Sequence, residues 1–233
     1  MRTAIAFLTP FGGARAPTPK SVRWFPAVGL VIGAGVGAVW RIGGAFWPVA
    51  VAAALAVIAD LALTGMLHVD GLVDSADGLL PHLERERRLE VMSEPSIGAF
   101  GVMVAGAVLL ARWVSLSSMD ADIWLIAGLW CLSRTAMVAV INSVPYARGS
   151  GLATAFQGEP HTPTVIVGSL VACVVVSLAI GLPAAVVIAA SWIAVLVTVA
   201  LAEARIGGYT GDVLGAVGVL AETVGLVVAA AKW

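Results

Sequence analysis

Long apolar runs constrain the fold of this chain more than any other feature of its sequence. About 20 apolar residues are needed for an α-helix to cross the roughly 30 Å hydrocarbon core of a bilayer. The runs are continuous and show no period-2 alternation, so helices are the only plausible form in which they cross a membrane. We therefore expect an all-α integral membrane protein, with spans at residues 25–40, 46–67, 97–118, 123–144, 164–180, 184–202 and 213–231.

The composition supports a single membrane-embedded domain over residues 1–233. Hydrophobic residues make up 60% of the chain, against about 45–50% in soluble domains. The first run, residues 25–40, is short for a span and rich in glycine. If this run only re-enters the membrane, the number of spans falls from seven to six. We predict a polytopic bundle of about 6–7 transmembrane helices.

The distribution of Lys and Arg orients this bundle. If every run crosses, residues 1–24, 66–96, 145–163 and 203–211 share one side and carry most of the basic residues. The positive-inside rule places that side in the cytoplasm. We expect a multi-pass protein of the cell (inner or plasma) membrane, with its N-terminus and its active-site loops in the cytoplasm.

The strongest candidate for a site is the acidic stretch His68-Val-Asp-Gly-Leu-Val-Asp-Ser-Ala-Asp-Gly-Leu-Leu80. Asp70, Asp74 and Asp77 are spaced i, i+4 and i+7, so they share one face if the stretch is helical. Like charges on one face repel each other, and Mg²⁺ binds carboxylate oxygens while leaving room for substrate phosphates. The alternative is a solvated acidic face, which seldom alternates with apolar residues as this one does. The stretch therefore predicts a metal site.

Charged residues inside the apolar runs need partners or a polar cavity, because an unpaired charge in hydrocarbon is costly. Arg134 lies near the middle of its run, and Asp60 and Glu222 are similarly placed. Arg134 therefore either pairs with these acids between helices or binds substrate, and the sequence leaves both alternatives open. Arg112 lies nearer the end of its run, where we expect its guanidinium to extend to the membrane interface.

Other polar segments are candidates for capping or binding. In the segment Arg205-Ile-Gly-Gly-Tyr-Thr-Gly-Asp212, Thr210 or Asp212 can cap the N-terminus of the last helix. The backbone amides at this helix start, exposed by the glycines, can also bind an anion. Residues 84–90 alternate acid and base, which predicts a salt-bridged surface helix. His68 lies opposite the aspartates of a helical stretch, so we expect it to be structural or to contact substrate.

The acidic stretch resembles the signature of the adenosylcobinamide-GDP ribazoletransferase (cobalamin synthase) family. Other pieces follow in that family's order: Phe25-Pro-Ala-Val-Gly-Leu, Arg88-Leu-Glu-Val-Met, Ile97-Gly-Ala-Phe-Gly-Val, Tyr146-Ala-Arg and Gly208-Tyr-Thr-Gly-Asp-Val-Leu-Gly-Ala. The resemblance covers essentially the whole chain. It departs at Ser93-Glu-Pro-Ser, where the family's pattern is Arg/Lys-Asp-Ser-Arg, so no phosphate-binding role is carried over to this turn.

The resemblance implies the last assembly step of the cobalamin nucleotide loop. Such an enzyme joins adenosylcobinamide-GDP to α-ribazole or its 5′-phosphate and releases GMP, with Mg²⁺ as cofactor. Phosphoryl transfer of this kind depends on positioning and charge neutralisation. The metal ligands would be Asp70, Asp74 and Asp77. The catalytic candidates are Asp77 and Asp74, and one of them, Asp77 by preference, would accept the ribazole hydroxyl proton. The candidates for contacting substrate are His68, Asp212, Arg134, Arg148, Arg23 and Lys20.

Two other functions remain open. A CDP-alcohol phosphotransferase also uses aspartates along a helix, but its Asp-Gly-(x)2-Ala-Arg element is missing here. A cation transporter would use Asp60, Arg134 and Glu222 along a path, yet the acidic stretch lies beside the membrane core and the spans show no internal repeat. The expected partners are the two substrates, adenosylcobinamide-GDP and α-ribazole or its 5′-phosphate, and the lipid bilayer. We expect no nucleic acid to bind. The sequence leaves open whether the chain forms a homo-oligomer.

Overall fold

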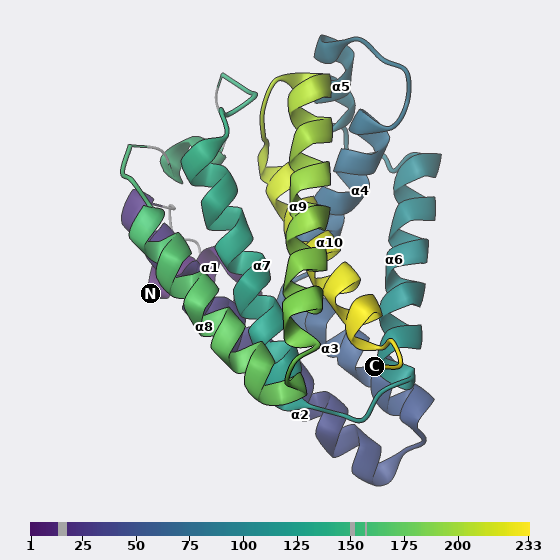
Figure 1. Ribbon diagram of the computed structural model, residues 1–233. Coiled ribbons are helices and arrows are strands. Elements are labelled where there is room, and N and C mark those ends of the chain that lie inside the picture. The colour runs from purple at the N-terminus through teal and green to yellow at the C-terminus, as the bar shows by residue number, and fades with distance from the viewer. Residues whose placement is uncertain (14–17, 150–151, 157) are drawn as a thin grey trace.

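The structure is a computed structural model, and it is helical throughout the residues that it describes: 1–13, 18–149, 152–156 and 158–233 (Figure 1). Within these ranges no β-strand forms, and an isolated bridge pairs Tyr146 with Tyr209. The helices are α1 Arg2–Leu8, α2 Phe25–Phe46, α3 Val49–Leu63, α4 Leu67–Leu79, α5 Arg85–Val91, α6 Ala99–Ser117, α7 Ile123–Ser143, α8 Thr162–Ile180, α9 Ala184–Ile206 and α10 Gly211–Ala229, with 3₁₀ turns at Pro10–Gly12, Pro19–Trp24 and Leu152–Phe156.

The apolar runs form membrane-spanning helices, which confirms the predicted all-α integral membrane protein. In the described part of the chain, 6 helices are long and apolar enough to cross a membrane: α2, α6, α7, α8, α9 and α10. The first run is longer than residues 25–40, because α2 continues through Arg41 to Phe46 and comprises 22 residues. α2 is therefore long enough to cross the membrane by itself, which favours a full span over the re-entrant alternative.

The second expected span, residues 46–67, is wrong as a single straight helix. α3 ends at Leu63, and Gly65 and Met66 follow with φ values of 58° and 61°. α4 then leaves at 88° to α3, so the pair is either a broken span or a re-entrant element. Left-handed backbone at successive residues interrupts a helix. The break directs the acidic stretch into the bundle, where α4 packs against α6 and α10.

α7 forms the centre of the bundle, with α2, α8 and α10 packed around it (Figure 1). Most of its residues are buried, Trp130 and Leu132 among them. α2 approaches α7 at glycines: a Cβ added to Gly33 would lie 2.6 Å from the carbonyl oxygen of Ile126. The glycines of the first run are therefore helix-packing positions, as small residues in membrane helices commonly are.

The polar loops that were predicted to share one side meet at one end of the bundle, where Figure 1 places α5 above α4. The guanidinium of Arg85 on α5 donates hydrogen bonds to the carbonyl oxygens of Ile206, 2.9 Å away, and Ala147, 3.0 Å away. These bonds connect α5 to the end of α9 and to the loop that follows α7. Segments far apart in the sequence thus form one polar end.

Candidate functional site

α4 and α10 approach each other at glycines, and this contact brings the acidic helix beside Asp212. A Cβ added to Gly71 would lie 2.7 Å from the carbonyl oxygen of Asp212, and one added to Gly215 would lie 3.0 Å from the carbonyl oxygen of His68. A larger side chain at Gly71 would push the two helices apart. Gly71 and Gly215 thus allow α4 and α10 to pack closely against each other.

Arg88 on α5 holds the other end of α4. It is 3% exposed, and its Nη1 donates hydrogen bonds of 2.8, 3.1 and 2.8 Å to the carbonyl oxygens of Gly78, Leu79 and Pro81. A cation at a helix C-terminus satisfies the free carbonyl groups and opposes the helix dipole. The acid–base alternation predicted a salt-bridged surface helix, which describes Arg87 but not Arg88. The sequence signal for this role was Pro81, which ends α4 just after Leu80. The last carbonyl groups of a helix that ends there need hydrogen-bond donors from elsewhere.

Asp70 and Asp74 are the uncommitted carboxylates of the acidic face. Asp70 is exposed and Asp74 is partly buried, and within the described residues neither one has a hydrogen bond or an ion pair. The charges that act on Asp74 come from Asp212, Asp70 and Asp77, which repel it, and from Arg148, which attracts it. Several carboxylates thus gather around one arginine, an arrangement that favours a cationic ligand.

Asp77 is held by hydrogen bonds from the start of α6, which the sequence did not predict. It is 8% exposed, and its carboxylate oxygens accept hydrogen bonds from the backbone N–H groups of Gly98, 2.7 Å away, and Gly101, 2.9 Å away. These amides belong to the start of α6, so Asp77 caps that helix from a neighbouring one. Both oxygens are already engaged, which leaves Asp74 better placed than Asp77 to accept a proton.

Arg148 joins the site from the loop after α7, and Asp212 joins it from the first turn of α10. Arg148 Nη2 lies 3.3 Å from Asp212 Oδ2, and the Thr210 hydroxyl donates to the same oxygen at 3.1 Å. The Thr210 oxygen also accepts from the N–H of Val213 at 3.3 Å and so caps α10, as the sequence predicted. The structure therefore brings the predicted residues Arg148 and Asp212 together beside Asp74.

Tyr146 stands next to this ion pair and was not singled out from the sequence, although its Tyr-Ala-Arg motif was. Its ring contacts that of Tyr209 edge-on, with 5.3 Å between the ring centroids. Burial raises the pKa of Tyr146, Arg148 opposes the rise, and Asp212 adds to it. The phenol therefore stays protonated near neutral pH and keeps its hydroxyl as a donor.

A cavity of about 130 Å³ lies beside the acidic face and is lined by residues of α1, α2, α4, α7 and α10. Asp70 and Asp212 line it together with Phe7 and Phe25. His68 lines it as well, with 5% of its surface exposed. The Nδ1 atom of His68 is buried and has no hydrogen-bond partner among the described residues.

The carboxylates suit Mg²⁺ in their chemistry, although they do not form a complete cage. In residues 1–13, 18–149, 152–156 and 158–233, no group of 3 or more His, Cys, Asp or Glu side chains is arranged to hold a metal ion. Mg²⁺ usually takes one or two carboxylates and completes its coordination with water and substrate phosphates. Asp70 and Asp74 fit this mode, whereas the predicted three-aspartate set does not, because Asp77 is bonded to α6.

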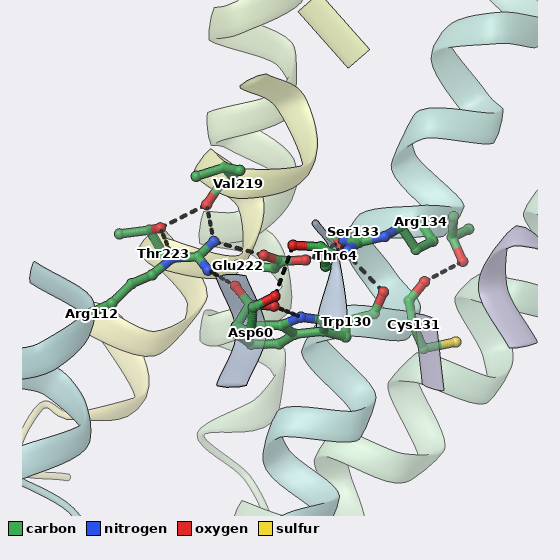
Figure 2. A network of polar contacts seen from close by, with 11 residues as sticks. Asp60, Thr64, Arg112, Trp130, Cys131, Ser133, Arg134, Val219, Glu222 and Thr223 are labelled. Carbon is green, nitrogen blue, oxygen red and sulfur yellow. Dashed lines mark hydrogen bonds and ion pairs between the residues drawn. The ribbon is translucent and has the colours of Figure 1, made fainter. Parts of the chain in front are cut away.

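Charged residues inside the bundle form a buried cluster (Figure 2). Arg134 pairs with Glu222, and Arg112 pairs with both Asp60 and Glu222 at 2.6 Å. Of the two alternatives for Arg134, the structure therefore shows the ion pair between helices. The side chain is 1% exposed, and the geometry gives no support for a substrate contact. The expected interfacial position of Arg112 is wrong: its guanidinium is buried because the acids of α3 and α10 are there to pair with it.

Arg23 lies away from the cavity beside the acidic face. Arg23 and Lys20 are both exposed in the 3₁₀ turn before α2, and the Arg23 guanidinium stands 5.6 Å from the centroid of the Trp24 ring. Arg23 lines a separate, largely apolar groove of about 450 Å³ with residues of α2, α7 and α8. The geometry therefore offers no support for a phosphate contact by Arg23.

The comparisons with known proteins agree along the whole chain. The family model described as cobalamin-5-phosphate synthase matches residues 1–230. A protein of Chlorobaculum parvum named adenosylcobinamide-GDP ribazoletransferase is 39% identical over 210 residues, which cover 87% of this chain and 82% of the relative. A protein of Bradyrhizobium diazoefficiens with the same name is 36% identical over 243 aligned residues, which cover 99% of this chain and 93% of the relative. No solved structure matches this chain significantly.

Proposed function

The chain belongs to the cobalamin-5-phosphate synthase family, and on this premise we propose that it is an adenosylcobinamide-GDP ribazoletransferase. The enzyme joins adenosylcobinamide-GDP to α-ribazole, or to its 5′-phosphate, and releases GMP. The observation that carries the proposal is the pair Asp70 and Asp74, whose carboxylates have no hydrogen bond or ion pair within the described residues, beside the ion pair of Asp212 and Arg148. This site lies at the polar end of the bundle, where the loops meet.

Each residue of the site has a separate role in the proposed phosphoryl transfer. A ribose hydroxyl of the acceptor forms a bond to the phosphorus that carries the cobinamide, the diphosphate bond breaks, and the bridging oxygen leaves with GMP. Asp74 accepts the hydroxyl proton, because its carboxylate is free within the described residues. Arg148 binds phosphate oxygens of the diphosphate, and its Nε is a buried donor without a partner in the described chain. Charge contacts of this kind stabilise the transition state.

Asp70 and Asp74 are the proposed ligands of magnesium. When bound, the ion supplies positive charge that neutralises the diphosphate and the departing GMP. Asp77 contributes as a positioning residue, since it holds the start of α6 against α4 through Gly98 and Gly101.

The polar end of the bundle is proposed to face the cytoplasm from the cell's inner membrane, with the N-terminus on the same side. The segments that meet at this end are rich in arginine, which the positive-inside rule assigns to the cytoplasm. The outer faces of α8 and α9 expose large apolar side chains suited to lipid, namely Ile166, Leu170, Leu178, Ile193, Leu196 and Val197.

Release of GMP by the purified protein tests the transferase directly. Wild-type protein is expected to release GMP only when adenosylcobinamide-GDP, α-ribazole and Mg²⁺ are all present. Asp70→Asn and Asp74→Asn keep the side-chain size and remove the charge, so each should lower turnover by about 10²-fold or more. Asp120→Asn is the matched control, because Asp120 is exposed in the turn between α6 and α7, and it should retain full turnover.

Two results would contradict parts of this proposal. If Asp70→Asn and Asp74→Asn both turn over substrate at the wild-type rate in saturating Mg²⁺, the proposed metal site is refuted. A folded wild-type protein that releases no GMP would refute the transferase itself. CDP-alcohols would then be the next substrates to test, and ion flux into vesicles would test a transporter.

A further inference from the structure

We propose that the cavity beside the acidic face binds the base of the acceptor nucleoside, a flat heterocycle of the benzimidazole class. This inference rests on the transferase function proposed above and names a subsite that the proposal leaves unassigned. Three features of the cavity carry it: a buried histidine nitrogen without a partner among the described residues, an aromatic wall, and carboxylates at one edge.

His68 provides a polar group that is ready for a ligand. It comes from the first turn of α4 and is 5% exposed, and its Nδ1 has no hydrogen-bond partner in the described chain. A buried polar group that stays unpaired is costly, and such groups usually have a partner in the functional state. A ligand with a single hydrogen-bonding ring atom at this point would satisfy it.

The rest of the inner wall is apolar and partly aromatic. The rings of Phe7 and Phe25 stack with 5.7 Å between their centroids, and Met137 and Leu214 line the same cavity. Aromatic faces and a thioether favour contact with a flat π system. A benzimidazole attached to ribose has one free ring nitrogen for His68 and an otherwise apolar rim. Guanine, the base of the donor, would leave several polar edge atoms unpaired against this wall.

The position of the carboxylates gives the ligand a direction. Asp70 and Asp212 line the same cavity as His68, so a base held by His68 presents its ribose to them. Ribose hydroxyls donate hydrogen bonds to carboxylates. A cavity of about 130 Å³ suits a bicyclic ring and excludes a corrin macrocycle. The acceptor hydroxyl then lies near Asp74, one helical turn beyond Asp70.

Steady-state kinetics of GMP release distinguishes this subsite from general damage. His68→Phe keeps a flat ring and removes both nitrogens, whereas His68→Asn returns an amide near the position of Nδ1. His68→Phe should raise KM for α-ribazole by about tenfold or more, leave KM for adenosylcobinamide-GDP unchanged, and be rescued by His68→Asn. His82→Phe is the control, because His82 is exposed and does not line the cavity. An unchanged KM for α-ribazole, or a raised KM for adenosylcobinamide-GDP instead, would overturn the inference.

A crosslinking experiment decides the question even if His68→Phe fails to fold. Leu67 lines the cavity and is 45% exposed, so Leu67→p-benzoylphenylalanine should fold and, on irradiation, capture radiolabelled α-ribazole. Unlabelled α-ribazole should compete and GDP should not. Leu80→p-benzoylphenylalanine is the control, because Leu80 is 41% exposed next to the other end of α4. Absence of labelling at Leu67, or competition by GDP, would overturn the inference. A wild-type protein that releases no GMP refutes the proposed function instead, and the crosslink still tests the subsite.

Discussion

Arg112→Met is expected to destabilise the bundle by about 3–5 kcal/mol, the usual cost of breaking a buried ion pair. The Arg112 guanidinium donates to Asp60 Oδ2 and Glu222 Oε2, each at 2.6 Å, and to Thr223 Oγ1 at 2.8 Å (Figure 2). Methionine has a similar volume and no donor, so two buried carboxylates lose the cation that they share. The expected cost comes from this uncompensated charge, because the apolar contacts are largely kept.

Two matched variants separate the charge from the packing. Arg112→Met combined with Asp60→Asn removes one charge of each sign and leaves Glu222 paired with Arg134. The double variant should therefore be more stable than the sum of the single effects, by about 0.5–3 kcal/mol. Arg87→Met removes an exposed arginine whose ion pairs lie on the surface, and it should leave stability unchanged.

Reversible unfolding in mixed micelles, titrated with SDS and followed by tryptophan fluorescence, measures the free energy of unfolding. Trp130 reports on the cluster itself, because its Nε1 donates to Asp60 Oδ1 at 2.8 Å. The expected loss corresponds to a shift of about 10²-fold or more in the unfolding equilibrium. A free energy within about 1 kcal/mol of wild type would refute the argument that Arg112 neutralises both acids. Strict additivity in the double variant would show that the four charges do not act as a unit.

Two smaller effects are expected outside the cluster. Asp77→Asn replaces one carboxylate oxygen by a donor that cannot accept from the first-turn amides of α6. It should therefore cost about 0.5–2 kcal/mol in thermal unfolding, and equal stability would show that these hydrogen bonds contribute nothing. Tyr146→Phe should leave the pH dependence of GMP release unchanged between pH 7 and about 9, because burial raises the pKa of the phenol and keeps it protonated. An ionisation in this range that disappears in the variant would contradict that reasoning.

The break between α3 and α4 shows what hydropathy does not detect. Residues 46–67 are apolar enough for one crossing, yet the chain turns by 88° after Leu63. Hydropathy sums side chains and carries no information about φ, and only Gly65 signalled a left-handed residue in this stretch. Met66 shares that conformation with φ 61°, and nothing in its residue type indicates it.

The sequence by itself determined the helical class, most of the membrane spans and the acidic face. Apolar runs and i, i+4 spacing act within one element, so they can be read without knowing the neighbours. The glycine positions on α2 belong to the same group, because small residues show where a helix is packed closely even before the partner is known.

Only the tertiary structure decided the role of each charged side chain. Asp77 bonds amides 21 and 24 residues later in the chain, and Arg112 reaches Glu222 across 110 residues. A buried charge takes the partner that the packing of other helices provides, and local sequence does not specify that partner. Asp74 and Asp77 are the same residue type on one face of one helix, yet α6 engages only Asp77. In the described part of the chain Asp74 has no hydrogen-bond partner, and it lies beside Asp212 because α4 meets α10 at Gly71.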